Sequence, residues 1–296
     1  MLLLVVLVTS GLVLLSPTAQ AADTGNAAPQ TGKIVSDEPG RNTPNILDGT
    51  VYSIAKVGNT MVVGGNFTQA NSGSGTATVT RRGVLAFDAT SGKISSAFAP
   101  DAFGTVYKVL PAADGKSVYV AGGFSFAGGQ SMPGRIFKIN VNTGVIDTTF
   151  VAPTISGDIR DLQLVGNHLF IAGKFTHING IAQKALGTIY ADTGKRDPYF
   201  NAVFAGLHNS TVAGAVTNVL QISVNKQNTQ LVAVGNFTTV DGQSKYQIVK
   251  FDIGNAPTAV DPTVHQTLNG WSTNLFTSAC SSKFDTYMSD VEYSPN

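Results

Sequence analysis

The residues best suited to chemistry in this 296-residue chain are few and scattered. The four histidines, His168, His177, His208 and His265, show neither the H-x-x-x-H nor the H-E-x-x-H spacing of zinc sites. The sequence also contains no G-x-S-x-G elbow, no phosphate-binding loop and no D-x-D-x-D-G calcium loop. It therefore indicates no catalytic residue, no metal ligand and no cofactor, and an enzyme is the less favoured interpretation.

The carboxylates recur at matched places instead of gathering in one segment. Asp88, Asp192 and Asp252 end similar apolar runs, and Asn140 ends a fourth. Such recurrence favours turn chemistry, because Asp and Asn side chains accept hydrogen bonds from the backbone that follows them. A glycosidase needs two opposed carboxyl groups about 5 to 10 Å apart, and the sequence alone does not assemble such a pair.

Three aromatic residues in or beside the longest loops are the candidate binding residues. The loops are 69–80, 201–215 and 256–269, and the candidates are Phe204, His208 and Trp271. An exposed Trp271, the only tryptophan, would offer a platform for a sugar ring. The favoured alternative is that it anchors the connection between two repeats, since a large aromatic side chain buries much apolar area.

The single cysteine, Cys280, suggests an incomplete pair. A secreted protein with one cysteine carries either a free thiol or a disulfide to a partner elsewhere. We expect a disulfide whose second cysteine lies outside this chain. A catalytic thiol is the alternative, although only His265 lies near Cys280 in sequence and no nucleophile motif surrounds it.

One phrase is repeated four times along the chain and indicates how these residues are positioned. It reads VVGGNFT at Val62–Thr68, VAGGFS at Val120–Ser125, IAGKFT at Ile171–Thr176 and AVGNFT at Ala233–Thr238. Its phenylalanines, Phe67, Phe124, Phe175 and Phe237, lie 57, 51 and 62 residues apart. A recurrence at this interval indicates an array of supersecondary units. We expect each Phe to be buried between sheets, not to bind a ligand.

Each unit predicts four short antiparallel strands. Alternating runs rich in Val, Ile, Phe and Tyr are separated by tight-turn pairs such as Gly58-Asn59 and Asp114-Gly115. Four strands in about 50 residues match a β-propeller blade. The sequence therefore predicts an all-β partial propeller over 45–296. Its units cover about 46–100, 101–153, 154–215 and 216–270, with an incomplete unit at 271–296.

Composition and the chain ends indicate an exported protein. Charged residues make up only 12% of the chain and no basic stripe occurs, which argues against a nucleic-acid partner. Residues 1–21 predict a signal peptide and residues 22–44 a flexible leader. The apolar run is about 14 residues, shorter than the ~20 of a membrane span, so we expect none in the mature chain.

The C-terminal residues predict the beginning of a further unit. Tyr287–Pro295 resembles the first strand of the earlier units, which predicts that the sequence is a fragment of a longer protein with further C-terminal domains. Since each repeat buries its apolar face on its neighbours, residues 22–296 expressed alone are expected to self-associate.

The repeat resembles a known family. VYVAGGFSFAGG at Val118–Gly129 and VNTGVIDTTFVAP at Val141–Pro153 resemble the delta-60 repeat (kelch-like) propellers of secreted, mainly actinobacterial, surface proteins. The resemblance covers roughly Ile46 to Gly254 and resumes at Trp271–Asn296. It implies an extracellular propeller, no established enzymatic activity and no catalytic residues. The copper site of the more distant galactose oxidase propellers requires a Tyr/His/Cys group that this sequence does not supply.

The function expected from these patterns is recognition. The sequence predicts a secreted or cell-wall-associated propeller that acts as a non-catalytic binding or scaffold module, with a glycan or a protein as its ligand. Two alternatives stay open: a propeller enzyme acting on extracellular polysaccharide, and a purely structural spacer in a larger surface protein.

Overall fold

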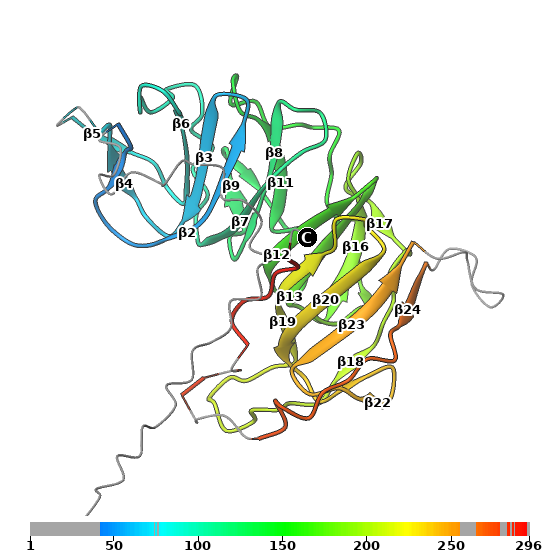
Figure 1. Ribbon diagram of the computed structural model, residues 1–296. Helices are drawn as coiled ribbons and strands as arrows, with labels where there is room; N and C mark the ends of the chain where they lie inside the picture. The colour runs from blue at the N-terminus through cyan, green and yellow to red at the C-terminus, as the bar shows by residue number, and fades with distance from the viewer. Residues whose placement is uncertain are drawn as a thin grey trace, which may run out of the picture. The chain divides into compact units, whose positions relative to one another are not determined.

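The computed structural model describes residues 42–73, 75, 77–254, 265–278, 283–284, 286 and 288–294, all of which belong to the unit Gly40–Asn296. These residues form strands, turns and loops but no helix, and every strand pairing is antiparallel. The expected all-β class is therefore confirmed (Figure 1). The expected signal peptide, the leader up to residue 41 and Cys280 lie outside the described residues.

Four larger sheets follow one another along the chain, and each contains one copy of the repeated phrase. They are β2 (Val51–Val57), β3 (Thr60–Gly65) and β6 (Val84–Asp88); β7 (Val106–Pro111), β8 (Ser117–Gly122) and β11 (Ile136–Asn140); β12 (Asp158–Val165), β13 (His168–Lys174), β16 (Leu186–Tyr190) and β17 (Arg196–Asp197); and β19 (Asn218–Val224), β20 (Gln230–Asn236), β23 (Ile248–Ile253) and β24 (Gln266–Leu268). The first strands are neighbours in sequence order, because β2 contacts β7, β7 contacts β12 and β12 contacts β19. The sheets are thus stacked in chain order.

A small hairpin follows each copy of the phrase, and in two units it pairs with the segment that enters the same unit. They are β4 (Gln69–Asn71) with β5 (Thr78–Thr80), β9 (Phe126–Ala127) with β10 (Gln130–Ser131), β14 (His177–Ile178) with β15 (Ile181–Ala182), and β21 (Thr239–Val240) with β22 (Gln243–Ser244). The entering segments include β1 (Asn45–Ile46), which pairs with β4, and β18 (Phe204–Ala205), which pairs with β21. All three long loops expected from the sequence, 69–80, 201–215 and 256–269, therefore contain short strands.

The phrase is buried as the sequence predicts. Phe67, Phe124, Phe175 and Phe237 are at most 1% exposed. A Cβ atom added to the glycine two residues before each Phe would lie 2.0 to 2.2 Å from a carbonyl oxygen in, or directly before, the adjacent first strand. That strand carries a β-bulge at the same place in all four sheets. The glycine is required because the bulged strand approaches too closely for a side chain.

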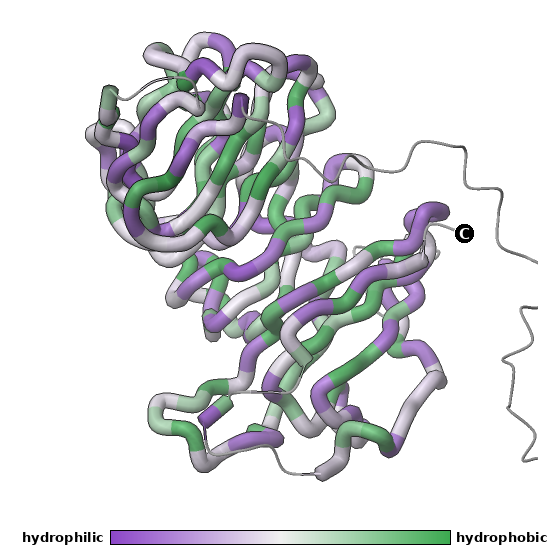
Figure 2. Tube along the Cα trace, turned by 60° about the vertical axis from the view of Figure 1, so that its left-hand side comes forward, coloured by the Kyte–Doolittle hydropathy of each residue, from purple (hydrophilic) through white to green (hydrophobic). Residues whose placement is uncertain are grey.

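The hydrophobic core is divided into clusters between consecutive sheets. One cluster combines residues of the first and second sheets, such as Val62 and Phe124, a second combines the second and third, such as Tyr119 and Phe175, and a third combines the third and fourth, such as Phe170. Hydrophobic residues follow the strands and hydrophilic residues gather at many turns (Figure 2). The second and third sheets therefore each pack on two different neighbours, and a fourth cluster lies within the first unit.

The turn chemistry expected of the recurring Asp and Asn residues is found in three units. The Oδ1 atoms of Asp88, Asn140 and Asp192 accept hydrogen bonds from backbone amides within the next three residues. Asp252 differs, because its oxygens accept from Gln230 Nε2 at 3.0 Å and Asn269 Nδ2 at 2.7 Å. The carboxylate of Asp252 thus connects strands instead of closing a turn.

The expected fourth strand is complete in only two of the four sheets. The third and fourth sheets include β17 and β24. In the first two sheets the pairing is reduced to single bridges, Phe87 with Ile94 and Ile139 with Ile146. In the second unit the Thr149 amide donates to Asp147 Oδ1 at 2.9 Å. In the third unit the Tyr199 amide donates to Asp197 Oδ1 in the same way, at 3.0 Å, although β17 is formed there.

Candidate functional site

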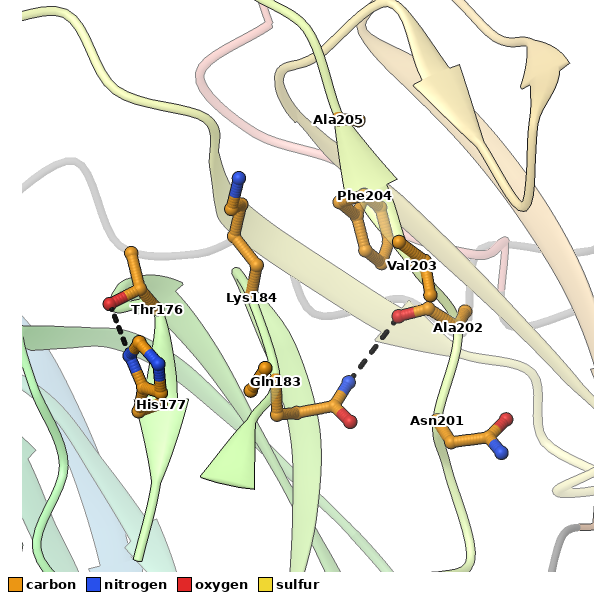
Figure 3. A pocket seen from close by; sticks show the side chains of 10 residues that line it. Thr176, His177, Gln183, Lys184, Asn201, Ala202, Val203, Phe204 and Ala205 are labelled. Atoms are coloured by element: carbon orange, nitrogen blue, oxygen red, sulfur yellow. Dashed lines mark hydrogen bonds between the residues drawn. The ribbon is translucent and has the colours of Figure 1, made fainter. Parts of the chain in front are cut away.

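A cavity of about 540 Å³ lies between the hairpin β14–β15 of the third unit and the segment 201–205 that leads into the fourth. Its lining residues are Thr176, His177, Ala182, Gln183, Lys184 and 201–205. In Figure 3, Thr176 and His177 lie on one side, 201–205 lie on the other, and Gln183 and Lys184 lie between them. The cavity is therefore built from two units, with the repeated phrase on one wall.

A two-residue turn closes the hairpin β14–β15, which forms one wall of the cavity. Asn179 and Gly180 both have positive φ angles, 54° and 74°, which suit a two-residue hairpin turn. Ile178 is buried and forms a bridge to Ile155, which anchors the hairpin to the core. This local structure places His177 and Ala182, which face each other in the strand pairing, at the cavity.

The opposite wall is mostly apolar. Phe204 is fully buried, with its ring centroid 5.1 Å from that of Phe237 and 6.1 Å from that of Phe251. Next to it, Val203 is 63% exposed, and its backbone amide donates to Asp241 Oδ1 at 2.7 Å. The structure thus places the candidate Phe204 in the aromatic core behind the cavity, and Val203 is the side chain that a ligand would meet.

The rim is polar and carries one cation. Thr176 Oγ1 lies 2.8 Å from His177 Nδ1 and 3.0 Å from Ser156 Oγ, and Ser156 Oγ also accepts from the amides of Thr176 and His177. Lys184 lines the cavity and forms no ion pair with a described residue. No Asp or Glu belongs to the lining, so the cavity presents hydroxyl, imidazole and ammonium groups around an apolar wall.

The other two candidates, His208 and Trp271, lie elsewhere. His208 is partly buried and edge-on to Tyr246, and its Nδ1 is buried without a hydrogen-bond partner. Trp271 is 43% exposed, and its backbone carbonyl accepts from Lys245 Nζ at 2.6 Å. Burial lowers the pKa of Lys245. No hydrogen bond or ring contact joins Phe204, His208 and Trp271 within the described residues, so they form no common site.

A second histidine group is formed by residues far apart in the sequence. His168 Nδ1 lies 2.7 Å from Oδ2 of the buried Asp197, and the His168 ring stacks on Tyr199 with centroids 3.7 Å apart. The ring of Tyr199 also stacks with His265, at 5.2 Å. Burial raises the pKa of the Tyr199 hydroxyl. The sequence interpretation missed this group because nothing in the spacing of 168, 197, 199 and 265 indicates it.

Two general features complete the description of these residues. In the part of the chain that the structure describes, no three His, Cys, Asp or Glu side chains gather at a metal-binding distance. Within the same ranges, no helix has the length and apolarity needed to cross a membrane.

Comparison with known proteins gives no family. No protein-family model matches the chain, and no curated protein matches it. Among solved structures, the chain is similar to the crystal structure of the computationally designed Ika4 protein, at 12% sequence identity and a TM-score of 0.38. The match covers 66% of this chain and 90% of that one. A similarity at this score carries no conclusion about the fold or the function.

Proposed function

We propose that the chain is a secreted or cell-surface β-propeller of the delta-60 repeat type that acts as a non-catalytic binding module. Two features support the propeller. Four antiparallel sheets follow one another with neighbouring first strands, and their Gly-x-Phe phrases all have the same bulged, buried geometry. Propeller blades are sheets of this kind, and each packs its two faces on its neighbours.

The binding role rests on one observation, the cavity between β14–β15 and 201–205. Binding sites in proteins are mostly apolar clefts with a few placed polar groups, and here the apolar Val203 lies opposite Lys184 and the Thr176–His177 pair. Such a cavity fits an aliphatic side chain next to a carboxylate. The ligand we propose is therefore an acidic, aliphatic peptide segment of a partner protein.

The two alternatives find less support in this cavity. A glycosidase requires a pair of carboxyl groups, and no Asp or Glu lines the cavity. A pure spacer makes no use of the cavity, in which Val203 lies opposite Lys184 and the Thr176–His177 pair.

The experiment that tests the binding role is a titration with designed peptides. Acetylated hexapeptides that combine Val or Leu with Asp or Glu are compared with peptides in which Lys replaces the acidic residue. We expect binding of the acidic peptides and a loss of about tenfold or more in affinity in both Lys184→Gln and Val203→Asp. Lys116→Gln, an exposed cation outside the cavity, is the matched control. Equal affinity in all four proteins would refute the proposed site, and no binding by any peptide would leave the spacer as the better function.

Export is tested separately on the secreted protein. If residues 1–21 act as a signal peptide, the mature protein begins at Ala22, which mass spectrometry of its N-terminal peptide measures directly. A mature N-terminus at Met1 would contradict export by this route.

A further inference from the structure

The β-bulges of the first three sheets bring three side chains into one row of contacts, called the stack below, in which the two tyrosine rings are tilted by 53°. The extra residue of each bulge lies between Val51 and Ser53, between Val106 and Lys108, and between Ile159 and Asp161, which makes these residues Tyr52, Tyr107 and Arg160. The ring centroids of Tyr52 and Tyr107 are 5.5 Å apart, and Arg160 Cζ lies 3.8 Å from the centroid of Tyr107. The stack runs across β2, β7 and β12.

Contacts between the neighbouring first strands hold the stack in place. Ser53 Oγ accepts from the Val109 amide at 3.1 Å, and Lys108 Nζ lies 2.7 Å from Oδ1 of the buried Asp161. Oδ2 of Asp161 accepts from the Ile222 amide at 2.9 Å. These ties hold β2, β7 and β12 in a fixed lateral order, so the stacked side chains are pre-organised before any ligand arrives.

The open end of the stack is accessible and amphipathic. Tyr52 is 48% exposed, and Ile54, the next residue on the same face of β2, is 59% exposed, followed by the exposed Lys56. The phenolic hydroxyls of Tyr52 and Tyr107 have no hydrogen-bond partner among the described residues. The hydroxyl of the core residue Tyr119, in contrast, donates to the Ala191 carbonyl at 2.7 Å. This face of β2 therefore combines apolar area with free hydroxyl and ammonium groups.

We propose that this face, Tyr52, Ile54, Lys56 and Tyr107, is a binding platform for a polymer of hexopyranose sugars. A pyranose ring has an apolar C–H face, which packs on an aromatic ring, and hydroxyls at its edge, which pair with phenolic and ammonium groups. The half-exposed Tyr52, next to the partly buried Tyr107 and Arg160, supplies both at once, at a low cost in side-chain entropy since two χ angles fix a Tyr ring. The extended face fits a chain of sugars better than a single small molecule.

The platform is separate from the cavity of the proposed function. It lies on β2 and β7, the first strands of the first two sheets, whereas the cavity is lined by the end of the third phrase, the hairpin after it and 201–205. The inference therefore goes beyond the proposed peptide site, and an experiment can refute either proposal without refuting the other. A variant at Lys184 leaves the sugar platform intact, and a variant at Tyr52 leaves the cavity intact.

The test is a calorimetric titration with cellohexaose, laminarihexaose, chitohexaose and hexagalacturonate. We expect at least one of them to bind, with an affinity about tenfold or more lower in Tyr52→Ala and closer to wild type in Tyr52→Phe, which keeps the ring. Phe126→Ala, an exposed aromatic outside this face, and Lys184→Gln should bind like the wild type. Circular dichroism checks that each variant is folded.

Three outcomes would overturn the proposal. The first is that none of the four oligosaccharides binds in the millimolar range. The second is that Tyr52→Ala binds the active oligosaccharide as well as wild type does. The third is that peptides rich in Trp and Tyr bind at Tyr52 and no oligosaccharide does, which would make the face a protein-binding surface.

Discussion

The substitution Gly173→Ala should destabilise the fold strongly, although it adds only one methyl group. The new Cβ would lie 2.0 Å from the carbonyl oxygen of Asp158, where an ordinary contact begins at 3.4 Å. The obstacle is backbone, so it cannot rotate away as a side chain could. Strands β12 and β13 must therefore separate by about 1.4 Å at the bulge.

The expected loss follows from what the separation disturbs. One or two backbone hydrogen bonds at the bulge weaken, each worth about 0.5–1.5 kcal/mol net. Phe175, two residues further on, loses part of its packing, and complete removal of a buried Phe costs about 3–5 kcal/mol. Alanine restores about 0.4–1 kcal/mol by restricting the unfolded chain. The net prediction is a loss of about 2–4 kcal/mol in the free energy of unfolding.

Urea unfolding followed by circular dichroism measures this loss. The matched control is Gly270→Ala, because an added Cβ there meets nothing within 4 Å and the φ angle of Gly270 is not left-handed. We expect the control to equal or slightly exceed wild type in stability. If Gly173→Ala falls within about 1 kcal/mol of the control, the close approach of the two strands does not constrain this position and the explanation of the repeated phrase is wrong.

Three further predictions concern the core, a buried ion pair and pH. Phe175→Ala should lower the free energy of unfolding by about 3–5 kcal/mol, whereas the half-exposed Phe103→Ala should change it far less; urea unfolding compares them, and equal losses would contradict the assignment of the phrase to the core. Lys108→Met leaves the buried Asp161 without its cation and should cost about 3–5 kcal/mol; a double-mutant cycle with Asp161→Asn should show strong coupling, and additive losses would argue against the pair. A hydrogen bond from the Thr149 hydroxyl lowers the pKa of Asp147, so its contribution to stability is present above the unfolded pKa of about 3.9 and is lost as pH falls through the folded value. The contribution of Asp161 to stability changes with pH in the opposite direction. Burial raises the pKa of Asp161, so its contribution to the free energy of unfolding declines as pH rises from about 3.9 through the folded pKa. Urea unfolding between pH 2 and pH 7 should therefore show a shallower acid loss in Asp147→Asn than in wild type, and parallel curves would refute this assignment.

The sequence predicts local features that depend on one strand and its neighbour in the chain. Alternation, turn pairs such as Gly58-Asn59 and the burial of Phe175 follow from residue type and spacing alone, and the structure confirms them. The repeat also indicates that the glycine of the phrase allows a bulge or a close approach. What it does not show is that the partner is a carbonyl of the first strand.

Features that depend on the position of the backbone and not on residue type were beyond the sequence interpretation. The left-handed residue before the third strand of each unit, with φ between 52° and 69°, is glycine only at Gly83; it is Arg135, Ala185 and Gln247 elsewhere, so composition conceals it. The stack of Tyr52, Tyr107 and Arg160 was missed for the same reason, because its members share a bulge position and not a residue type.

The candidate site was only partly accessible from the sequence. Residues 201–205 of the candidate loop 201–215 line the cavity, and the sequence interpretation named Phe204 there because aromatic residues are common ligand platforms. Its ring is instead used by the core, next to Phe237. Lys184 belongs to no sequence motif, and only the fold brings it to the same cavity as Thr176 and His177.

The division of the core into one cluster for each pair of consecutive sheets has a consequence for how such a chain can grow. Each of these three clusters is shared by two sheets only, so duplication of one unit adds one sheet and one new cluster and leaves the others unchanged. Stability is then gained in increments that depend on the nearest neighbour. Genetic duplication or loss of a unit is thus a small step for this architecture, and the variable length of the segments between phrases, such as 201–215, is where successive copies can diverge without disturbing the sheets.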